Sequence, residues 1–331
     1  MTSGYTVGLI GAGGIAPSHV TAWRSLGVNV INFSTGGDSA SLCEKYDATE
    51  VRSLDELLAG CHAVDVCTPT PSHPELVAAA AAAGRQVLCE KPLALTSDLA
   101  KDMIARCEQA GVKLYPAHVV RFFAAYARAH DHIAAGGVGD VAVARYLRMG
   151  ARPSQGWYAD PAESGGIIFD LMIHDLDFAR WIAGDVTKVF ARDSGSIGDR
   201  KAAVSAHVIL THASGAVSEC TGNWRPGGKF DTRFTIAGDG GMINHEREAY
   251  QPFVLDACAE DAETGYVPTA GFTESPYLTE IREFHAAFLG GPEPRVTAAD
   301  GLAAIQIAEA AAESARTGAA IELEVTAGAR P

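Results

Sequence analysis

The first 118 residues alternate between short apolar runs and helical patterns, and this alternation limits the possible folds more than any other feature. The strand-like runs are 5–10, 29–34, 63–68, 85–90 and 112–117, and the helical patterns between them are 15–26, 39–46, 53–59, 74–83 and 97–110. Strands that alternate with helices of this length form βαβ units, with helices on both faces of a parallel sheet. We therefore expect a doubly wound α/β fold over residues 1–118.

The pattern changes after residue 119. A helical stretch over 121–135 leads to a strand-like run over 141–149 and then to an apolar helix that begins near residue 165. Further β-rich runs lie near 186–192, 203–210, 216–223, 230–237 and 241–246. These runs predict a second α/β domain, residues 119–331, built on a large, mainly antiparallel open sheet. The acidic stretch 249–275 is weakly patterned and is expected to be a long surface loop.

Charge excludes several classes of partner. The formal net charge is −14, whereas binding to nucleic acid or to an anionic membrane requires an excess of Lys and Arg. No apolar run approaches the ~18 residues of a membrane span, and the N-terminus lacks the basic region of a secretory signal. The seven cysteines form no CxxC pair, so neither a disulfide framework nor a zinc site is expected. We expect a cytoplasmic protein that binds a small molecule and no metal.

The stretch "GLIGAGGIA" follows the first strand and opens the first helix. Gly11, Gly13 and Ala16 match the G-x-G-x-x-G/A pattern, in which glycines let the backbone approach a pyrophosphate at a helix N-terminus. Taken alone the pattern is weak, but here it stands at the first strand of a βαβ series, its required context. It predicts a dinucleotide site that includes Gly11, Gly13, Gly14 and Ile15.

The end of the second strand bears on the choice between NAD and NADP. NAD-binding folds usually place an acid there to bind the ribose, but this chain has "NFSTGGD", in which Asp38 comes late. Ser34 and Thr35 could accommodate a 2′-phosphate, so the sequence leans slightly toward NADP and leaves NAD open. The alternative is that this loop only turns the chain.

Two further loops follow strands, "CTPTPSHPEL" (67–76) and "CEKPLA" (89–94). Loops at the carboxyl ends of parallel strands are where ligands bind in such folds. The additional cofactor contacts predicted here are Thr68, Pro69, His73, Glu90 and Lys91. The alternatives are that Lys91 is an ordinary surface lysine and that His73 starts a helix without any chemical role.

The stretch "GGIIFDLMIHDLD" (165–177) predicts a helix that is apolar in nearly every direction and therefore buried. At ~100° per residue, Asp170, His174 and Asp177 fall on one stripe. Burying an unpaired charge costs several kcal/mol. Either these groups form a structural pair, or they line a cavity that a ligand fills.

Five stretches, in this order, resemble the Gfo/Idh/MocA family of NAD(P)-dependent oxidoreductases. They are "GAGGIA", "CTPTPSH", "EKPLA", "SGGIIFDLMIHDLDFARWIAG" and "YLTEIREFHAAFLGGPEP". The resemblance covers nearly the whole chain, and its most specific parts are the Glu-Lys-Pro triplet and the glycine-rich lead into Asp-x-x-x-His. The stretches "SQGWYADPAESGG" and "AHVVRFFAAY" are most similar to dehydrogenases of the inositol 2-dehydrogenase type.

The resemblance implies a Rossmann domain followed by an α/β domain whose open sheet often forms an oligomer interface, hence a homodimer or homotetramer. It implies that Lys91, Asp170 and His174 are the catalytic set of a dehydrogenase or reductase acting on a hydroxyl or keto carbon of a sugar or cyclitol. Asp170 would orient the imidazole of His174. His174 would accept the hydroxyl proton, and Lys91 would stabilise the developing alkoxide.

Three residues are candidate substrate contacts: Arg121, Trp157 and Tyr158. The alternatives are an interdomain salt bridge for Arg121 and simple packing for Trp157. Two other functions compete with the dehydrogenase: hydrolysis of glycosides through transient oxidation by tightly held NAD, and a dinucleotide sensor without catalysis. Retention of the proton-transfer residues speaks against the sensor.

Overall fold

The computed structural model describes residues 4–152, 156–194, 204–225, 227–246 and 274–324. The chain divides into two compact units, Met1–Phe123 with Ala270–Leu302, and Ala124–Thr269 with Ala303–Pro331. Each unit has its own sheet, and each is described by itself below. Among the described residues, no helix combines the length and the apolar character that crossing a membrane requires. The predicted loop 249–275 lies almost wholly outside the described residues.

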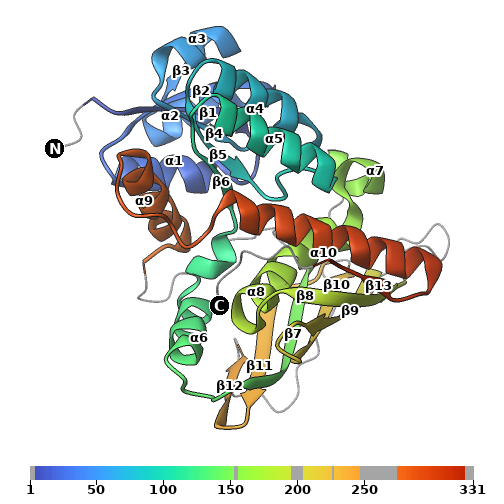
Figure 1. The fold of residues 1–331 in the computed structure, drawn as a ribbon. Coiled ribbons are helices and arrows are strands. Elements are labelled where there is room, and N and C mark those ends of the chain that lie inside the picture. The colour runs from blue at the N-terminus through green and yellow to red at the C-terminus, as the bar shows by residue number, and fades with distance from the viewer. Residues whose placement is uncertain (1–3, 153–155, 195–203, 226, 247–273, 325–331) are drawn as a thin grey trace. The chain divides into compact units, whose positions relative to one another are not determined.

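The first unit is built on a six-stranded sheet in the order β3-β2-β1-β4-β5-β6 (Figure 1). Its strands are β1 (Thr6–Ala12), β2 (Asn29–Gly37), β3 (Thr49–Glu50), β4 (Ala63–Val66), β5 (Gln86–Glu90) and β6 (Leu114–Ala117). All neighbouring strands are parallel. This strand order is that of the dinucleotide-binding doubly wound fold, and it confirms the predicted fold of the first domain.

The helices between these strands begin and end where the local sequence allows. They are α1 (Ala16–Ser25), α2 (Ser39–Tyr46), α3 (Leu54–Gly60), α4 (His73–Ala82) and α5 (Ser97–Gln109), with short 3₁₀ turns η1 (Thr70–Ser72) and η2 (Val119–Phe122). The side chains of Asp38, Ser53 and Thr96 accept a backbone N–H in the first turn of α2, α3 and α5, which satisfies otherwise unpaired donors. The predicted helix over 121–135 is instead η2 followed by α6 (Ala124–Ala134).

A helix from late in the chain, α9 (Pro276–Phe288), also belongs to the first unit. Its apolar face joins the core formed by β1, α1 and β6, and the ring of Phe284 stacks on Tyr115 with centroids 5.2 Å apart. The predicted division between residues 118 and 119 assigned this segment to the second domain. The structure differs because this apolar face is buried in the first core rather than in the second.

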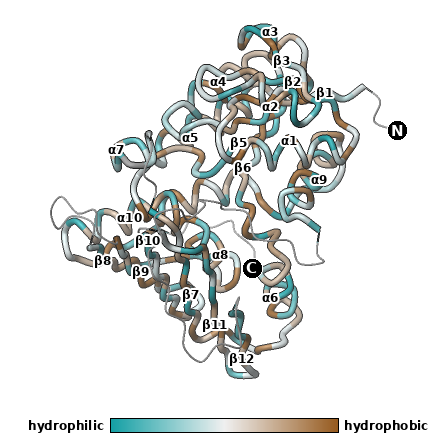
Figure 2. Tube along the Cα trace, turned by 180° about the vertical axis from the view of Figure 1, so that it is seen from behind, coloured by the Kyte–Doolittle hydropathy of each residue, from teal (hydrophilic) through white to brown (hydrophobic). Residues whose placement is uncertain are grey.

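The second unit holds a seven-stranded sheet in the order β12-β11-β7-β10-β9-β8-β13. Its strands are β7 (Val141–Ala151), β8 (Val186–Asp193), β9 (Val204–His212), β10 (Val217–Arg225), β11 (Asp231–Gly238), β12 (Gly241–Glu246) and β13 (Ile321–Glu322). Among the described strands of this sheet, only the β7–β10 pair is parallel, so the prediction of a mainly antiparallel sheet is confirmed. Hydrophobic positions recur along β8 and β9 in Figure 2.

The remaining elements are short helical turns and two longer helices. The turns are η3 (Gly156–Ala159) and α7 (Pro161–Ser164), and the longer helices are α8 (Ile173–Ala183) and α10 (Ala298–Thr317). The predicted single helix from residue 165 is interrupted, because η4 (Ile168–Met172) is a π-helical segment directly before α8. Gly222 of β10 makes room for its last residue, since a Cβ there would lie 2.4 Å from Cγ of Met172.

Candidate functional site

The glycine-rich turn between β1 and α1 has the form that a dinucleotide needs. Gly11 has φ +108° and leaves no space for a side chain, because a Cβ would lie 2.5 Å from the carbonyl oxygen of Cys67. A Cβ at Gly13 or Gly14 would meet nothing within 4 Å, so this side of the turn is open. Ile15 precedes α1 and gives the helix no side-chain cap. The turn therefore fits a pyrophosphate at the helix N-terminus.

The end of β2 is held against this turn by a buried amide. The side-chain nitrogen of Asn32 donates to the carbonyls of Leu9 and Gly11, both at 2.9 Å, and its oxygen accepts from Ser39 at 2.6 Å. Ser34 and Thr35 follow on the surface, and the hydroxyl of Ser34 donates to the carbonyl of Gly36. The late acid, Asp38, caps α2.

The loop after β4 lies beside the glycine turn. Thr68 contacts the position that a Cβ on Gly11 would take, at 3.2 Å, and its hydroxyl shares a hydrogen bond of 2.7 Å with Ser72. Pro69 precedes the short turn η1. Gly11, Thr68 and Pro69 thus lie at the carboxyl edge of the first sheet, as the sequence pattern predicts for cofactor contacts.

His73 and Glu90 are buried and engaged within the protein. The two ring nitrogens of His73 contact the carbonyl oxygens of Pro92 and Thr68, each at 2.9 Å, and burial lowers the pKa of this imidazole. Glu90 Oε1 contacts His19 Nε2 at 3.0 Å, and Glu90 Oε2 accepts the backbone N–H of Lys91 at 3.0 Å. We therefore remove both side chains from the expected cofactor contacts.

The residue that the sequence analysis missed here is His19. Its Nδ1 lies 2.9 Å from an oxygen of Asp65, and the indole of Trp23 donates to the same oxygen at 2.7 Å. Burial, the largest single influence, lowers the pKa of this imidazole, but Asp65 and Cys67 together outweigh burial and hold the pKa of His19 well above its usual value. His19 thus lies between two buried carboxylates, Asp65 and Glu90, which favour its protonated form. A histidine inside the first helix, with an acid in each of two later strands, gives no local pattern that would reveal this.

Glu280 of α9 adds a third buried acid to this region. Its side chain is fully buried, and neither carboxylate oxygen has a hydrogen-bond partner among the described residues. Burial raises the pKa of Glu280 well above its usual value, and the imidazolium of His19 lowers it by less. Burial therefore favours the protonated, neutral form of this group.

In the second unit, the predicted helix residues lie on two different segments. Asp170 is buried in η4, while His174 is half-buried and Asp177 is buried in α8. Between them, Asp175 accepts two hydrogen bonds from the guanidinium of Arg148 on β7, at 2.8 and 2.9 Å. The sequence analysis did not single out this ion pair, which ties α8 to the sheet.

The three candidate substrate contacts differ in their surroundings. Arg121 is buried in the first unit, where it donates to the carbonyl of Arg295 at 2.8 Å and pairs with Asp300 at 3.2 Å. The rings of Trp157 and Tyr158 in η3 stack with centroids 3.9 Å apart, and Tyr158 is exposed. Arg121 thus has structural partners within its own unit, and we no longer count it as a substrate contact.

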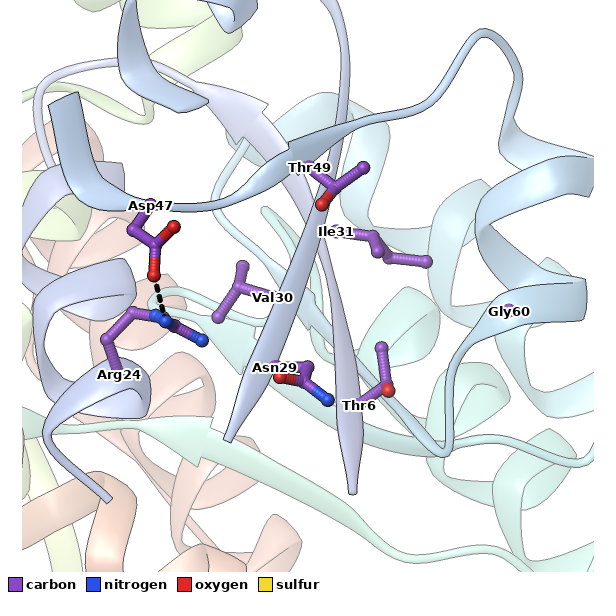
Figure 3. A pocket seen from close by; sticks show the side chains of 8 residues that line it. All are labelled: Thr6, Arg24, Asn29, Val30, Ile31, Asp47, Thr49 and Gly60. Atoms are coloured by element: carbon purple, nitrogen blue, oxygen red, sulfur yellow. Dashed lines mark hydrogen bonds and ion pairs between the residues drawn. The ribbon is translucent and has the colours of Figure 1, made fainter. Parts of the chain in front are cut away.

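A polar surface pocket lies at the opposite edge of the first sheet (Figure 3). It is lined by Thr6, Arg24, Asn29, Val30, Ile31, Asp47, Thr49 and Gly60. Thr6 and Asn29 are the first residues of β1 and β2, whereas the glycine turn follows the end of β1. An ion pair joins Arg24 and Asp47 on one side of the pocket. This pocket is therefore separate from the dinucleotide turn.

Comparison with known proteins gives matches along most of the chain. Residues 5–118 match the family described as "Oxidoreductase family, NAD-binding Rossmann fold", and residues 126–244 match the "GFO/IDH/MocA C-terminal domain". The 1,5-anhydro-D-fructose reductase of Ensifer adhaerens is 32% identical over 96% of this chain and 98% of its own. The inositol 2-dehydrogenase of Rhizobium meliloti (strain 1021) is 30% identical over 93% and 96%.

The architecture is also similar to a solved structure, the crystal structure of a putative myo-inositol dehydrogenase from Sinorhizobium meliloti 1021. The TM-score is 0.82 with 27% sequence identity, and the alignment covers 97% of this chain and 100% of the other. The similarity therefore includes both units and the order of their elements.

Proposed function

The chain belongs to the GFO/IDH/MocA family of NAD-binding oxidoreductases, and from this premise we propose that it transfers a hydride between a nicotinamide and a CH–OH or keto carbon of a sugar or cyclitol. The observation that carries the proposal is the open glycine turn before α1 together with Lys91 at the end of β5. The names of the two relatives, an anhydrofructose reductase and an inositol dehydrogenase, favour a polyhydroxylated ring.

The proposed cofactor contacts are at the carboxyl edge of the first sheet. They are Gly11, Gly13, Gly14, Ile15, Ser34, Thr35, Thr68, Pro69 and Lys91. We propose NADP as the preferred cofactor, because the end of β2 offers the hydroxyls of Ser34 and Thr35 and no carboxylate to repel a 2′-phosphate. Ser34→Asp should weaken NADP binding at least about tenfold and NAD binding much less. Titration of each cofactor by protein fluorescence measures both, and an unchanged NADP affinity would remove the proposed role of Ser34.

The proposed catalytic set is Lys91, Asp170 and His174. When bound, the nicotinamide accepts or gives the hydride. In the oxidation, the imidazole of His174 takes the proton from the substrate hydroxyl, and Asp170 orients this imidazole. The ammonium of Lys91 stabilises the negative charge that develops on the same oxygen. The stacked rings of Trp157 and Tyr158 are proposed to contact the apolar face of the sugar ring.

The test is the absorbance of reduced nicotinamide. The purified protein is given NAD or NADP in turn with a panel of inositols, hexoses and sugar acids, with a control that lacks added cofactor. Sustained reduction with one cofactor and substrate pair is the expected result. Binding of cofactor without net reduction by any of these substrates would favour the hydrolytic or sensing alternative, because neither turns over free cofactor.

Two substitutions test the catalytic set. Lys91→Ala and His174→Ala should each abolish turnover. The affinity for the cofactor should stay nearly intact, because the glycine turn that holds the pyrophosphate is unchanged and Lys91 is only one of the proposed cofactor contacts. Steady-state kinetics and cofactor titration measure the two properties separately. Wild-type turnover in both variants would show that the catalytic assignment is wrong.

We also propose that the chain forms a homodimer or homotetramer through the open face of the second sheet. Three apolar side chains, Val143, Ile209 and Val217, are exposed on this sheet, as is Met242 of the edge strand β12. Val217 and Val143 are register partners on adjacent strands. Exposed apolar residues that neighbour one another, as Val143 and Val217 do, are typical of protein interfaces.

A further inference from the structure

The two oxygens of the Glu90 carboxylate have different partners. Oε1 contacts the ring of His19, and Oε2 accepts the backbone N–H of Lys91, both at 3.0 Å. The side chain of Glu90 is 11% exposed, so water does not readily replace either partner. The carboxylate therefore links a buried imidazole to the main chain of the lysine.

His19 is itself fixed. Its other ring nitrogen contacts Asp65 of β4, whose carboxylate also accepts from Trp23. His19 and Trp23 belong to α1, the helix that begins at the glycine turn. A continuous chain of buried hydrogen bonds thus runs from α1 through Asp65, His19 and Glu90 to the N–H of Lys91. A fully bonded buried network of this kind holds its members rigidly.

The residue after Lys91 is also held. The carbonyl of Pro92 contacts Nδ1 of His73, and the other nitrogen of the same ring contacts the carbonyl of Thr68. The main chain of Lys91 is therefore fixed on both sides by buried imidazoles, His19 through the side chain of Glu90 and His73 through Pro92. Lys91 itself is half-buried. Its side chain is thus attached to a main chain that is held on both sides.

We propose that Glu90 is a positioning residue. Its Oε2 fixes the main chain of Lys91, so that the lysine ammonium is held close to the substrate oxygen on which negative charge develops. This inference rests on the proposed function, because it gives Lys91 the catalytic role stated there. The positioning depends on a side-chain oxygen that is close enough to accept the Lys91 N–H, and not on the negative charge of Glu90. Misplacing a catalytic group by about 1 Å costs up to about 100-fold in rate.

Two conservative substitutions distinguish the effect of the length of the Glu90 side chain from the effect of its negative charge. Glu90→Gln removes the charge but keeps an oxygen for the Lys91 N–H. Without the Glu90 charge, the His19 ring can keep only the Nδ1 proton that faces Asp65, and the Gln amide nitrogen then donates to its free Nε2. Glu90→Asp keeps the charge but shortens the side chain by one methylene, so the carboxylate no longer spans both partners. Glu108→Asp, on the exposed surface of α5, is the matched control.

The kinetic readout compares the change in kcat with the change in KM for each variant. Glu90→Asp should lower kcat by about 30-fold to 100-fold and change the KM and the cofactor affinity by less than about threefold. Glu90→Gln should stay within about threefold of the wild-type kcat, as should Glu108→Asp. A kcat for Glu90→Asp equal to that of the wild type overturns the proposal, as does an equal loss in Glu90→Gln.

The second readout needs no turnover. In protein labelled with ¹⁵N-lysine, the Lys91 amide signal is identified by its absence in Lys91→Arg. In the wild type and in Glu90→Gln this amide should be shifted downfield and exchange slowly with solvent, and in Glu90→Asp it should lose both properties. An unchanged amide in Glu90→Asp overturns the proposal even if no substrate is found.

The two hypotheses fail in different ways. If Lys91→Ala keeps the wild-type kcat, the catalytic set is wrong and the role of Glu90 falls with it. If Lys91→Ala is inactive while Glu90→Asp loses the amide hydrogen bond and retains full kcat, the proposed function stands and the positioning role alone is wrong.

Discussion

Glu280 is a buried acid in the first core, and its contribution to stability depends on pH. Burial raises the folded-state pKa well above 4.5, so the folded protein keeps a proton that the unfolded chain has lost. The stability from this group is fully present below about pH 4.5 and is lost as pH rises toward the folded-state pKa. Glu280→Gln does not titrate, so its stability relative to the wild type should increase with pH by up to about 1.4 kcal/mol per unit.

Urea unfolding of Glu280→Gln and the wild type between pH 5 and pH 8 measures this difference. Glu108→Gln on the surface of α5 is the control for the same change at an exposed position. A difference for Glu280→Gln that is independent of pH would show that the acid is ionised in the folded protein.

At the residue scale, local spacing identifies some functional positions and misses others. Gly11 and Gly13 could be found because the dinucleotide-binding pattern places glycines at fixed offsets within one short stretch. His19 and Glu280 could not, because each acquires its environment from elements far away in the sequence. Glu90 shows both cases: the Glu-Lys-Pro triplet marks it, but only the structure places its carboxylate on His19 and on the N–H of Lys91.

At the element scale, α8 is anchored to the second sheet by the buried pair of Arg148 and Asp175, whose side chains are 1% and 2% exposed. Arg148→Met should destabilise the protein by about 3 to 5 kcal/mol, because it leaves Asp175 buried without its partner. The same change at Arg145, an exposed residue of the same strand that pairs with Glu219 at 3.6 Å, should cost less than about 1 kcal/mol.

Chemical denaturation of the two variants gives the comparison directly. Because His174 immediately precedes Asp175 in α8, Arg148→Met should also lower kcat, whereas Arg145→Met should not. Equal stability of the two variants would mean that the ion pair does not hold the helix.

The same helix shows where periodicity stops being informative. A uniform 100° per residue places Asp170, His174 and Asp177 on one stripe, but the π-helical segment η4 changes the rotation before α8 begins. Met172, the last residue of η4, packs against Gly222 of a strand that comes much later in the chain, and local periodicity does not reveal such a contact. A helix here was therefore predictable from the sequence, while its π-helical segment and the orientation of side chains along it were not.

At the scale of the whole molecule, the order of strands and helices is largely predictable, and the assignment of α9 is not. The alternation of the first 118 residues requires a doubly wound sheet, and the later β-rich runs require a second sheet. An amphipathic helix such as α9 shows from its sequence that one face must be buried. It does not show which core receives that face, and here the core of the first unit does.

The exposed apolar residues of the second sheet lead to a prediction about assembly. Val217→Glu places a charge beside Val143 on the open face, and burying that charge between two subunits would cost several kcal/mol. The wild type should therefore have a mass that is a multiple of 34.6 kDa, and the variant should dissociate toward the single-chain mass. Leu99→Glu makes the same change at an exposed apolar residue of α5 in the first unit and should leave the mass unchanged. Light scattering after size-exclusion chromatography measures all three masses, and a wild type that elutes as a single chain would show that this face is not an interface between copies.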